Sequence, residues 1–568
     1  MGTEQHPMHY ELRLISTSSG IGYFACCPKE NLGSDVALAY LRAHPHDEFM
    51  HKHVLDRVTE RTVEHLGQMI EEAQGDPVFL AILCEAVLTN QKFSRLRNRF
   101  AEGELERLSK QTPLIYIKSN MLKDRLLHVQ WIDLLRRNLF EHASLSDLLH
   151  KRLPLPFAGA LSPTAEGRAH VRQIQRQMAA PGPSSEKPVC PPEETARKAL
   201  ERLQAIGVIA SAELKHKSSL SPFGFLRKWR LSLSVFHGKH NYTLKGIQTS
   251  YGRGLLEASA RASYAMEMVE RCSSFCSFDS AGALGFIRDY PLIHASHGDL
   301  KDQKLNALDP NSLNLEVPYA NELLYWMEAE QGGGSTSAPI LIPAQCVFLF
   351  CNLDEISLFS GLGSTGLASG NSMTQAKASA LLEVIERDSE AVTPYEPSRC
   401  FKLRADDPVV TALLADYHAR GVHVQFQDIS PENGVPAYKC FVVGPQGQII
   451  KGTGAHLDGK KALLSAMTET PYPFPNGPAS TPTPKDLPTV YFEDLPDYST
   501  GAPAGDLAVL ERVLELNGYQ PIYINLTRKD IGIPVVKAIV PGLELMADFD
   551  QFSRVSPRLL SRIQEIGS

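Results

Sequence analysis

The sequence contains one eleven-residue pattern twice, and this duplication constrains the fold more than any other feature. SYAMEMVERCS (263–273) and SALLEVIERDS (379–389) both read Ser-x-x-x-Glu-x-x-Glu-Arg-x-Ser, at an offset of 116 residues. Three upstream residues match at the same offset: Gly254 with Gly370, Ala260 with Ala376, and Ala262 with Ala378. So many identities at one offset indicate an internal pseudo-repeat, in which each acidic helix follows a glycine turn.

In both copies the first serine and the two glutamates share one face of a helix. Successive residues turn by about 100°, so positions i, i+4 and i+7 fall on one narrow stripe. The stripes consist of Ser263, Glu267 and Glu270 in the first copy and of Ser379, Glu383 and Glu386 in the second. The other directions are largely apolar, which is typical of a buried helix, so we expect the glutamates to be buried as well.

The four glutamates allow two interpretations. As solvated Glu–Arg pairs they would be ordinary surface features, since such pairs are common and weak. The duplication and the apolar surroundings instead favour four carboxylates that meet in one cleft, which requires cations. Hard oxygen ligands suit Mg²⁺, and Mg²⁺ usually shares its coordination sphere with nucleotide phosphates. Arg271 and Arg387 would add positive charge toward those phosphates.

The loop before the second acidic helix is rich in glycine. It contains a literal GxGxxG from Gly361 to Gly366. A dinucleotide-binding fingerprint would need a βαβ unit with an acidic residue after it, and none is evident. An amide-rich loop that leads into a helix N-terminus suits phosphate binding, and a plain surface loop is the alternative.

Length and composition predict a multidomain protein of the cytoplasm. With 568 residues the chain is too long for one ordinary core. The net charge of −7 gives no indication of a nucleic-acid or membrane partner. The N-terminus lacks the layout of a secretory signal, and no run approaches the roughly 18 apolar residues that span a bilayer. The 10 scattered cysteines fit reduced thiols.

The chain divides by composition into three parts. Residues 1–176 form a mostly helical region, with apolar spacings of three and four residues between 30 and 155. Residues 177–194 are a proline-rich linker. From 187 to 568 we expect an α/β (α+β) domain with core motifs at about 240–568. A helix that ends at Gly207 opens it. Strand-like runs follow at 229–236, 345–352, 422–428, 437–444, 523–527 and 534–544.

These motifs resemble the YcaO family of ATP-dependent peptide-modifying proteins. Gly252–Gly254 with the first acidic helix is similar to the first ATP-binding motif of the family, and 363–389 to its second. Residues 454–470 are similar to the third motif, and 530–544 to the C-terminal strand region. The resemblance covers about 187–568, and the role of residues 1–176 stays open.

The resemblance implies a bound ATP and its Mg²⁺ ions. The implied nucleotide contacts are Lys187, Thr195, Ser263, Glu267, Arg271, Asn371, Arg387 and Glu469. The implied metal ligands are Glu267, Glu270, Gln375, Glu383 and Glu386.

Three departures from the family pattern affect the expected chemistry. Gln375 stands where a metal-binding glutamate is usual, and Ser465 where an arginine is usual. Azoline-forming members end in Pro-x-Pro-x-Pro, whereas this chain has that pattern only internally, from Pro471 to Pro475.

The resemblance implies phosphorylation of a peptide backbone amide oxygen by ATP, as in cyclodehydratases and thioamidation enzymes, here with a thioamide or other non-azoline product. The alternative is a non-catalytic ATP-binding accessory protein, for example in methylthiolation of a ribosomal protein, which Gln375 and Ser465 favour. A phosphohydrolase of unrelated fold is a third hypothesis. The expected partner is a peptide or protein substrate, and a TfuA-like or other partner protein and a homodimer are open options.

Two further clusters have simpler interpretations. His44–His53 holds four histidines, which suit Zn²⁺ or Ni²⁺, although a solvated polar loop is the simpler interpretation. Cys272 and Cys276 lie four residues apart on the first acidic helix and are best explained by core packing.

Overall fold

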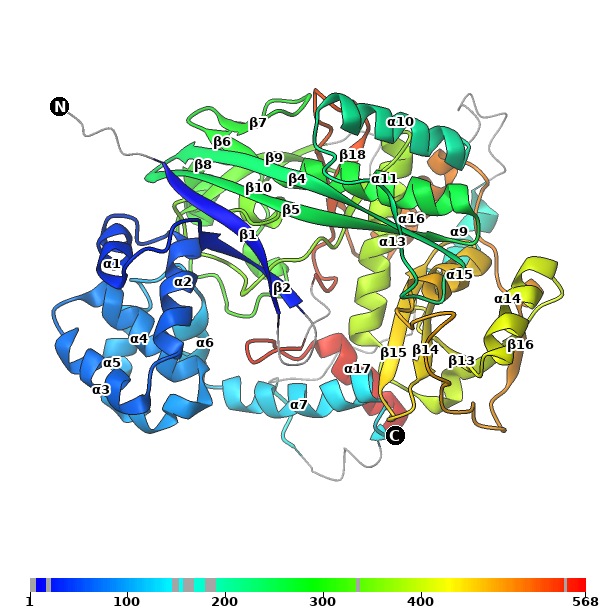
Figure 1. Ribbon diagram of the computed structural model, residues 1–568, viewed down its shortest axis with the longest axis horizontal. Coiled ribbons are helices and arrows are strands. Elements are labelled where there is room, and N and C mark those ends of the chain that lie inside the picture. Colours follow the sequence, from blue (N-terminus) through cyan, green and yellow to red (C-terminus); the bar gives the residue numbers. More distant parts are fainter. Residues whose placement is uncertain are drawn as a thin grey trace.

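The computed structural model describes residues 7–16, 22–145, 153–156, 168–178, 190–333, 338–545 and 549–567. Lys187 and most of the proline-rich linker lie outside this part of the chain. Three sheets are interleaved with helices, which confirms the mixed α/β (α+β) class (Figure 1). No helix among the described residues has the length and apolar character needed to cross a bilayer.

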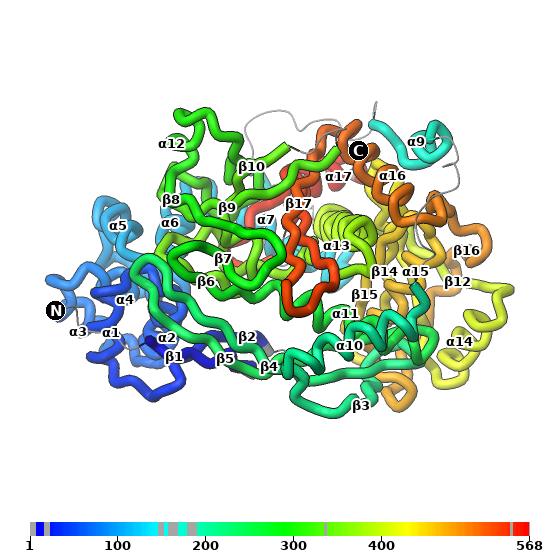
Figure 2. The backbone as a smooth tube through the Cα atoms, turned by 90° about the horizontal axis from the view of Figure 1, so that it is seen from above, coloured from blue at the N-terminus to red at the C-terminus, as the bar shows by residue number. Residues whose placement is uncertain are grey.

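The largest sheet has the strand order β2-β1-β5-β4-β6-β7, and β3 pairs with the N-terminal part of β4. Its strands are β1 (Met8–Ser16), β2 (Gly22–Pro28), β3 (Leu214–Lys215), β4 (Phe223–His237), β5 (His240–Gly254), β6 (Ser277–Asp279) and β7 (Gly282–Leu284). The long β4–β5 hairpin alternates buried and exposed side chains in β4, which is typical of a strand with one face in the core. Helices α10 (Pro192–Ala205) and α11 (Glu257–Ser274) pack together beside this hairpin (Figure 2).

The second sheet contacts both acidic helices. Its order is β10-β9-β17-β18-β11, with β8 on β9. Its strands are β8 (Ile293–Ala295), β9 (Leu324–Gln331), β10 (Ala338–Pro343), β11 (Leu367–Ser369), β17 (Ile522–Asn525) and β18 (Val535–Ile539). Helix α13 (Met373–Val392) packs against β18 and against α16 (Pro503–Leu516). The Ser372 side chain caps α13 by accepting a hydrogen bond from the Gln375 N–H, at 3.1 Å.

The third sheet has the order β15-β14-β13-β12-β16. Its strands are β12 (Cys400–Arg404), β13 (Val424–Asp428), β14 (Ala437–Val443), β15 (Ile449–Ala455) and β16 (Thr489–Tyr491). Helices α14 (Pro408–Ala419) and α15 (Gly459–Glu469) accompany it. The β15 edge lies beside α13, so this sheet forms a wall next to the second acidic helix (Figure 1).

The remaining helices are spread over the molecule, with the first six at one end and the last along the lower side in Figure 1. They are α1 (Ser34–Ala43), α2 (Glu48–Thr59), α3 (Val63–Glu72), α4 (Pro77–Thr89), α5 (Glu102–Leu108), α6 (Tyr116–Met121), α7 (Arg125–Glu141), α9 (Val171–Gln177), α12 (His297–Asp302) and α17 (Pro557–Gly567). Helices α7 and α17 share a hydrophobic cluster with the end of α13, in which Leu135, Val392 and Leu560 are all buried.

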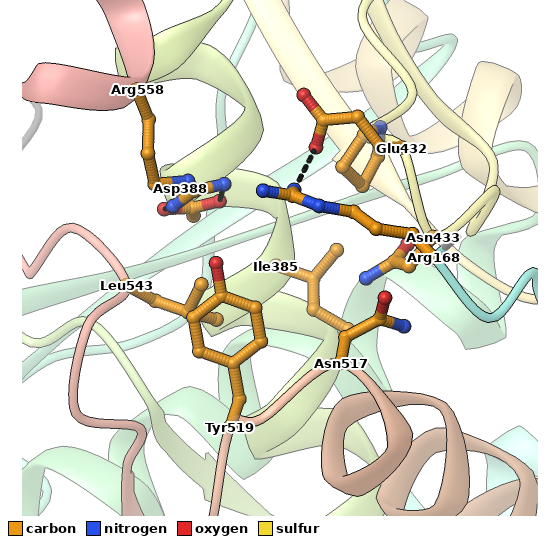
Figure 3. A pocket seen from close by; sticks show the side chains of 10 residues that line it. Arg168, Ile385, Asp388, Glu432, Asn433, Asn517, Tyr519, Leu543 and Arg558 are labelled. Atoms are coloured by element: carbon orange, nitrogen blue, oxygen red, sulfur yellow. Dashed lines mark hydrogen bonds and ion pairs between the residues drawn. The ribbon is translucent and has the colours of Figure 1, made fainter. Parts of the chain in front are cut away.

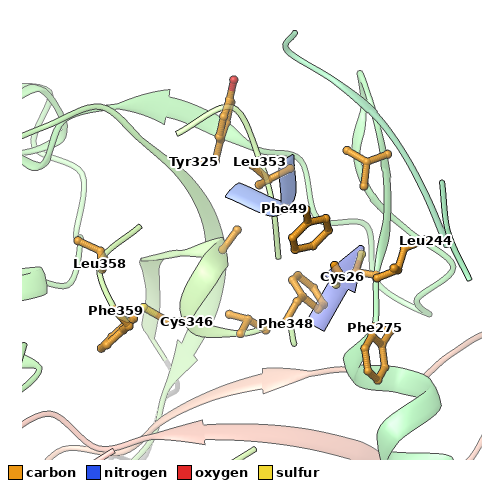
Figure 4. Close-up of a cluster of buried hydrophobic side chains, with 14 of the residues drawn as sticks. Cys26, Phe49, Leu244, Phe275, Tyr325, Cys346, Phe348, Leu353, Leu358 and Phe359 are labelled. Atoms are coloured by element: carbon orange, nitrogen blue, oxygen red, sulfur yellow. The ribbon is translucent and has the colours of Figure 1, made fainter. Parts of the chain in front are cut away.

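The packing of the N-terminal region differs from the expectation of a separate domain over residues 1–176. Strand β1 pairs in parallel with β5, so that Leu12 lies opposite Gly246. Cys26 and Phe49 also belong to the same buried cluster as Phe275 and Phe348 (Figure 4). The first helices therefore share a core with the predicted YcaO-like region, and the boundary near 176 stays a prediction.

Most predicted strands occur where the sequence places them, and one does not. The runs at 229–236, 422–428, 437–444, 523–527 and 534–544 each contain or overlap a strand, namely β4, β13, β14, β17 and β18. The prediction for 345–352 is wrong, because a short 3-10 helix (Ala344–Cys346) and irregular chain take its place. Val347 and Phe348 are each 2% exposed, and a short apolar run does not separate a strand from other buried chain.

Candidate functional site

Three strands each lead through glycine into a helix at the same place in the molecule. Strand β5 precedes α11, β11 precedes α13, and β15 precedes α15. A side chain at Gly252 would collide with the backbone of α11, and one at Gly454 with the backbone of α15. These close approaches seat the first and third helices directly against their own strands, which fixes where their side chains point.

The three helices and β15 enclose a cleft of about 770 Å³. Its charged and hydroxyl side chains are Arg253, Ser263, Glu267, Glu270, Arg271, Ser369, Ser379, Glu383, Glu386, Arg387, Glu390, Lys451, Thr453, Ser465 and Glu469, together with Tyr251 at its edge. The structure thus brings both glutamate stripes, both arginines and Glu469 to one place. Exposed fractions of 29% for Glu267, 15% for Glu270 and 16% for Glu386 show that these carboxylates are partly, not fully, buried.

Each glutamate stripe is paired with the arginine of its own helix. The Arg271 Nε atom lies 3.7 Å from a Glu267 oxygen and 3.8 Å from a Glu270 oxygen. Glu267 also accepts a hydrogen bond from the Tyr251 N–H at 2.9 Å. In the second stripe, Arg387 lies 4.0 Å from Glu386, which also accepts a hydrogen bond from the Thr453 hydroxyl at 2.8 Å.

The burial of the carboxylates disfavours their charged forms. Burial raises the pKa of Glu267, Glu270 and Glu386 above the ordinary glutamate value, with Arg271 and Arg387 acting in the opposite direction. Burial also raises the pKa of Glu383 to about 7. A cation placed among these side chains would therefore find four oxygen ligands whose ionisation it favours.

A buried lysine lies beneath the carboxylates. The Lys537 ammonium, on β18, donates to the Thr365 carbonyl of the glycine-rich loop at 2.7 Å. Burial lowers the pKa of Lys537 to about 8, and Glu383 and Glu270 act to raise it. Lys537 thus ties the glycine-rich loop to β18.

The chemistry of this donor set fits Mg²⁺. Hard carboxylate oxygens from two facing helices are the ligands that Mg²⁺ prefers, usually beside substrate phosphates. Within the described residues, no three His, Cys, Asp or Glu side chains already converge in metal-binding geometry. Arg271 and Arg387 neutralise the glutamates instead, so the metal role of the glutamates stays a prediction.

Three of the predicted contacts gather at the N-terminus of α13 and do not line the cleft. The Asn371 side-chain amide donates to the Thr195 hydroxyl at 3.0 Å. The Gln375 side-chain oxygen accepts the Asn371 N–H at 2.9 Å. Ser369, two residues before Asn371, does line the cleft, so this group borders it. Lys187 lies outside the described residues.

Sequence reasoning missed the basic residues that other elements bring to the cleft. Arg253, at the end of β5, forms an ion pair with Glu469 and lines the same cleft as Ser465, where the family pattern has an arginine. Lys451, on β15, lies 2.7 Å from Glu390. Arg253 could have been noticed between its two glycines, whereas nothing in the sequence locates Lys451.

The histidine-rich segment is not the solvated loop of its simpler interpretation. His51 lies inside α2, is fully buried, and has its Nε2 atom 2.6 Å from a Glu85 oxygen. His46 lies 3.0 Å from Asp354. Cys272 and Cys276 are buried, as core packing predicts.

Comparison with known proteins identifies the family of the chain. The family model described as YcaO cyclodehydratase, ATP- and Mg²⁺-binding, matches residues 251–472 and 472–544. The chain therefore belongs to the YcaO family, whose members are described as binding ATP and Mg²⁺. The matched segment contains both acidic helices and the third helix of the cleft.

Two relatives are similar in sequence. An uncharacterized protein of Methanothermobacter thermautotrophicus is 29% identical over 414 residues, which are 66% of this chain and 98% of that protein. A protein encoded in the tfuA 3′ region of Rhizobium leguminosarum bv. trifolii is 29% identical over 121 residues, which are 19% of this chain and 29% of that protein.

Two solved structures are similar in fold. YcaO from Methanopyrus kandleri bound with AMPPCP and Mg²⁺ is 20% identical, with a TM-score of 0.44 over 62% of this chain and 91% of that chain. A heterocyclase in complex with substrate and cofactor is 19% identical, with a TM-score of 0.48 over 66% of this chain. The chain spans 55% of the length of that heterocyclase.

Proposed function

We propose that this protein uses ATP and Mg²⁺ to phosphorylate a backbone amide oxygen of a peptide or protein, as a step in modifying that amide. The observation that carries the proposal is the cleft between α11 and α13, where both glutamate stripes face two arginines. A site with this balance of carboxylates and cations suits a metal-bound polyphosphate. The family model supports the same cofactors.

The acidic side chains would bind the metal, and the basic side chains would bind the phosphates. Glu267, Glu270, Glu383 and Glu386 would hold Mg²⁺, which when bound neutralises the phosphates and orients the γ-phosphate. Arg271 and Arg387 would turn from the glutamates toward the phosphates. In such transfers the catalytic effect comes mainly from positioning and charge neutralisation.

The remaining predicted contacts would complete the nucleotide site. Ser263 and Glu469 line the cleft, and Thr195 and Asn371 border it at the N-terminus of α13. Lys187 is retained as a predicted contact.

The proposed reaction replaces the amide oxygen. A nucleophile adds to the amide carbon, and the carbonyl oxygen forms a bond to the γ-phosphorus of ATP. The bond between that phosphorus and its bridging oxygen breaks, and its electron pair leaves with ADP. When the carbon–oxygen bond breaks, inorganic phosphate departs and the nucleophile stays on carbon. With hydrosulfide as nucleophile, the sulfur loses its proton as the carbon–sulfur double bond forms, and the product is a thioamide.

A thioamide or other non-azoline product is our preferred outcome. The similarity to a protein encoded in a tfuA region supports this outcome. The same similarity supports a TfuA-like protein as the partner. A non-catalytic ATP-binding accessory protein is the second candidate. It is favoured by Ser465, which places a hydroxyl instead of a guanidinium on the α15 side of the cleft.

One assay separates the two candidates. Purified protein is mixed with ATP, Mg²⁺ and candidate peptides, with and without sulfide, and with a TfuA-like partner. We expect phosphate release that depends on peptide. ATP binding without turnover in every mixture would favour the accessory role instead.

The cleft assignment has its own test. We expect Glu267→Ala and Glu383→Ala each to weaken Mg²⁺-dependent ATP binding by roughly 100-fold, since each removes a ligand from the metal. Calorimetric titration measures the affinity. Glu201→Ala is the matched control, because Glu201 forms an exposed helical pair with Arg197 away from the cleft. Unchanged affinity in both cleft variants would refute the assignment.

A further inference from the structure

One end of the cleft adds a lysine to the glutamates and arginines of the duplicated motif. Lys451 lines this end, and its side chain is 17% exposed. Its ammonium lies 2.7 Å from a Glu390 oxygen and 4.0 Å from the centre of the Phe140 ring, which belongs to α7. Lys451 is therefore held by a carboxylate and an aromatic face while its charge still borders the cleft.

A second lysine lies behind Lys451. In the β14–β15 pairing, Lys439 is opposite Thr453 and Phe441 is opposite Lys451. Opposite residues point to the same face of a sheet, so Lys439 points in the same direction as Thr453, whose hydroxyl contacts Glu386. Lys439 is 0% exposed, and its amine has no hydrogen-bond partner among the described residues.

The charges around this end favour an anion. Arg387, Lys439 and Lys451 are three basic side chains beside two acidic ones, Glu390 and Glu386, which lie 3.5 Å and 4.0 Å from Arg387. Burial acts to raise the pKa of Glu390, but Lys451 and Lys439 together hold it below its ordinary value. Burial and then the charge of Lys451 lower the pKa of Lys439 to about 7. The lowered pKa of Glu390 is the direction expected for a carboxylate beside several positive charges.

We propose that Lys451, with Lys439 behind it, forms an anion subsite that holds the phosphoryl group once it has left the nucleotide, and then inorganic phosphate. This inference rests on the proposed function. Lysine ammonium groups are common phosphate partners because they act as compact point charges. Glu390 is about one helical turn beyond Glu386, so the subsite lies roughly 5–6 Å further along α13 than the predicted metal ligands.

The subsite also gives the N-terminal region a part in the reaction. Phe140 supports Lys451 from α7, and the half-buried His142 ring lies against Phe441 with centroids 4.6 Å apart. Burial, with Lys439 and Lys451, lowers the pKa of His142 to about 2, so this ring stays neutral and adds no competing charge. Helix α7 thus positions Lys451 through the contact with the Phe140 ring.

Inorganic phosphate tests the subsite directly. Its binding is measured by calorimetry in the full chain with ADP and Mg²⁺ present, and as product inhibition of ATP turnover. We expect Lys451→Met to weaken phosphate binding at least tenfold and to lower kcat, while ATP affinity stays within about twofold. Lys451→Arg should retain most phosphate binding, because it keeps the charge. Lys439→Met should weaken phosphate binding less.

Lys460→Met is the matched control, because Lys460 also lies over an aromatic ring, Phe492, but does not line the cleft. Phosphate binding by Lys451→Met that equals the wild type would overturn the proposal. So would an equal loss of ATP and phosphate binding, since that would indicate a general effect on the cleft. Absence of ATP binding by the wild type would instead refute the proposed function.

Discussion

Helices α11 and α13 carry the same motif, but they differ in the turn that follows it. In α13 this turn holds Asp388 and Glu390, whereas the matching positions of α11 are Cys272 and Ser274. Glu390 pairs with Lys451 at the cleft, and Asp388 points to the opposite side. The duplication therefore accounts for two similar carboxylate pairs, while the added charges of α13 make one end of the cleft different from the other.

The back of α13 is fixed by ion pairs that α11 lacks at the corresponding position. Asp388 is buried and accepts two hydrogen bonds from Arg558 of α17, at 2.5 and 2.8 Å (Figure 3). A third comes from the Glu544 N–H at 2.9 Å. At the matching position of α11, Cys272 offers only a buried thiol, and its backbone carbonyl accepts a hydrogen bond from Arg528 at 3.3 Å. At this position the second acidic helix is thus anchored by charge, whereas the first is anchored by a buried thiol and a backbone hydrogen bond.

The largest effect that we expect from this difference concerns stability. Arg558→Gln should lower the stability of the fold by about 3–5 kcal/mol, because it leaves the Asp388 charge buried without its partner. Cys272→Ala at the matching position of α11 should cost about 1 kcal/mol. Thermal unfolding followed by circular dichroism measures both changes.

The double variant Asp388→Asn with Arg558→Gln serves as the control. It removes both charges, so it should lose less stability than the two single changes added together. If Arg558→Gln and Cys272→Ala cost the same, the two helices are anchored alike and the comparison fails.

The next effect is a pH dependence of stability that we assign to Glu383 of α13. The folded-state pKa of Glu383, at about 7, is above the ordinary value, so the folded chain binds this proton more tightly than the unfolded chain does. The resulting stability is present below the unfolded pKa of about 4.5 and is lost as the pH rises through the folded value. Glu383→Gln keeps this position neutral at every pH.

We therefore expect the nucleotide-free wild type to lose melting temperature more steeply than Glu383→Gln between about pH 5 and pH 8. Over the same range, Mg²⁺-dependent ATP binding by the wild type should strengthen as Glu383 ionises. Melting curves and titrations in matched buffers measure the two trends. Identical melting slopes for the two proteins would mean that Glu383 ionises normally.

Sequence periodicity predicted the acidic helices well because a helical stripe depends only on residues within one segment. Glu267 follows Gly254 by the same number of residues as Glu383 follows Gly370, and this spacing can be counted without knowledge of the fold. Lys451 and Arg253 could not be found in this way, since each reaches the cleft through strand pairing and packing between distant segments. The prediction of a strand at 345–352 failed for a related reason. A segment that is buried on all sides is apolar at every position, so it has no hydrophobic periodicity that would distinguish a strand from other buried chain.

The smallest effect concerns Gln375, where the second motif departs from its family. Its side-chain oxygen accepts the Asn371 N–H and does not reach the carboxylate stripe. Gln375→Glu should therefore change Mg²⁺-dependent ATP affinity by no more than about twofold, and the new charge near the N-terminus of α13 should add about 0.3–1 kcal/mol of stability. Ser259→Glu at the matching position of α11 is the control, because it puts the same charge near the other helix start. A tenfold or larger gain in ATP affinity confined to Gln375→Glu would place this residue among the metal ligands, and the metal set would then extend along α13 toward Asn371.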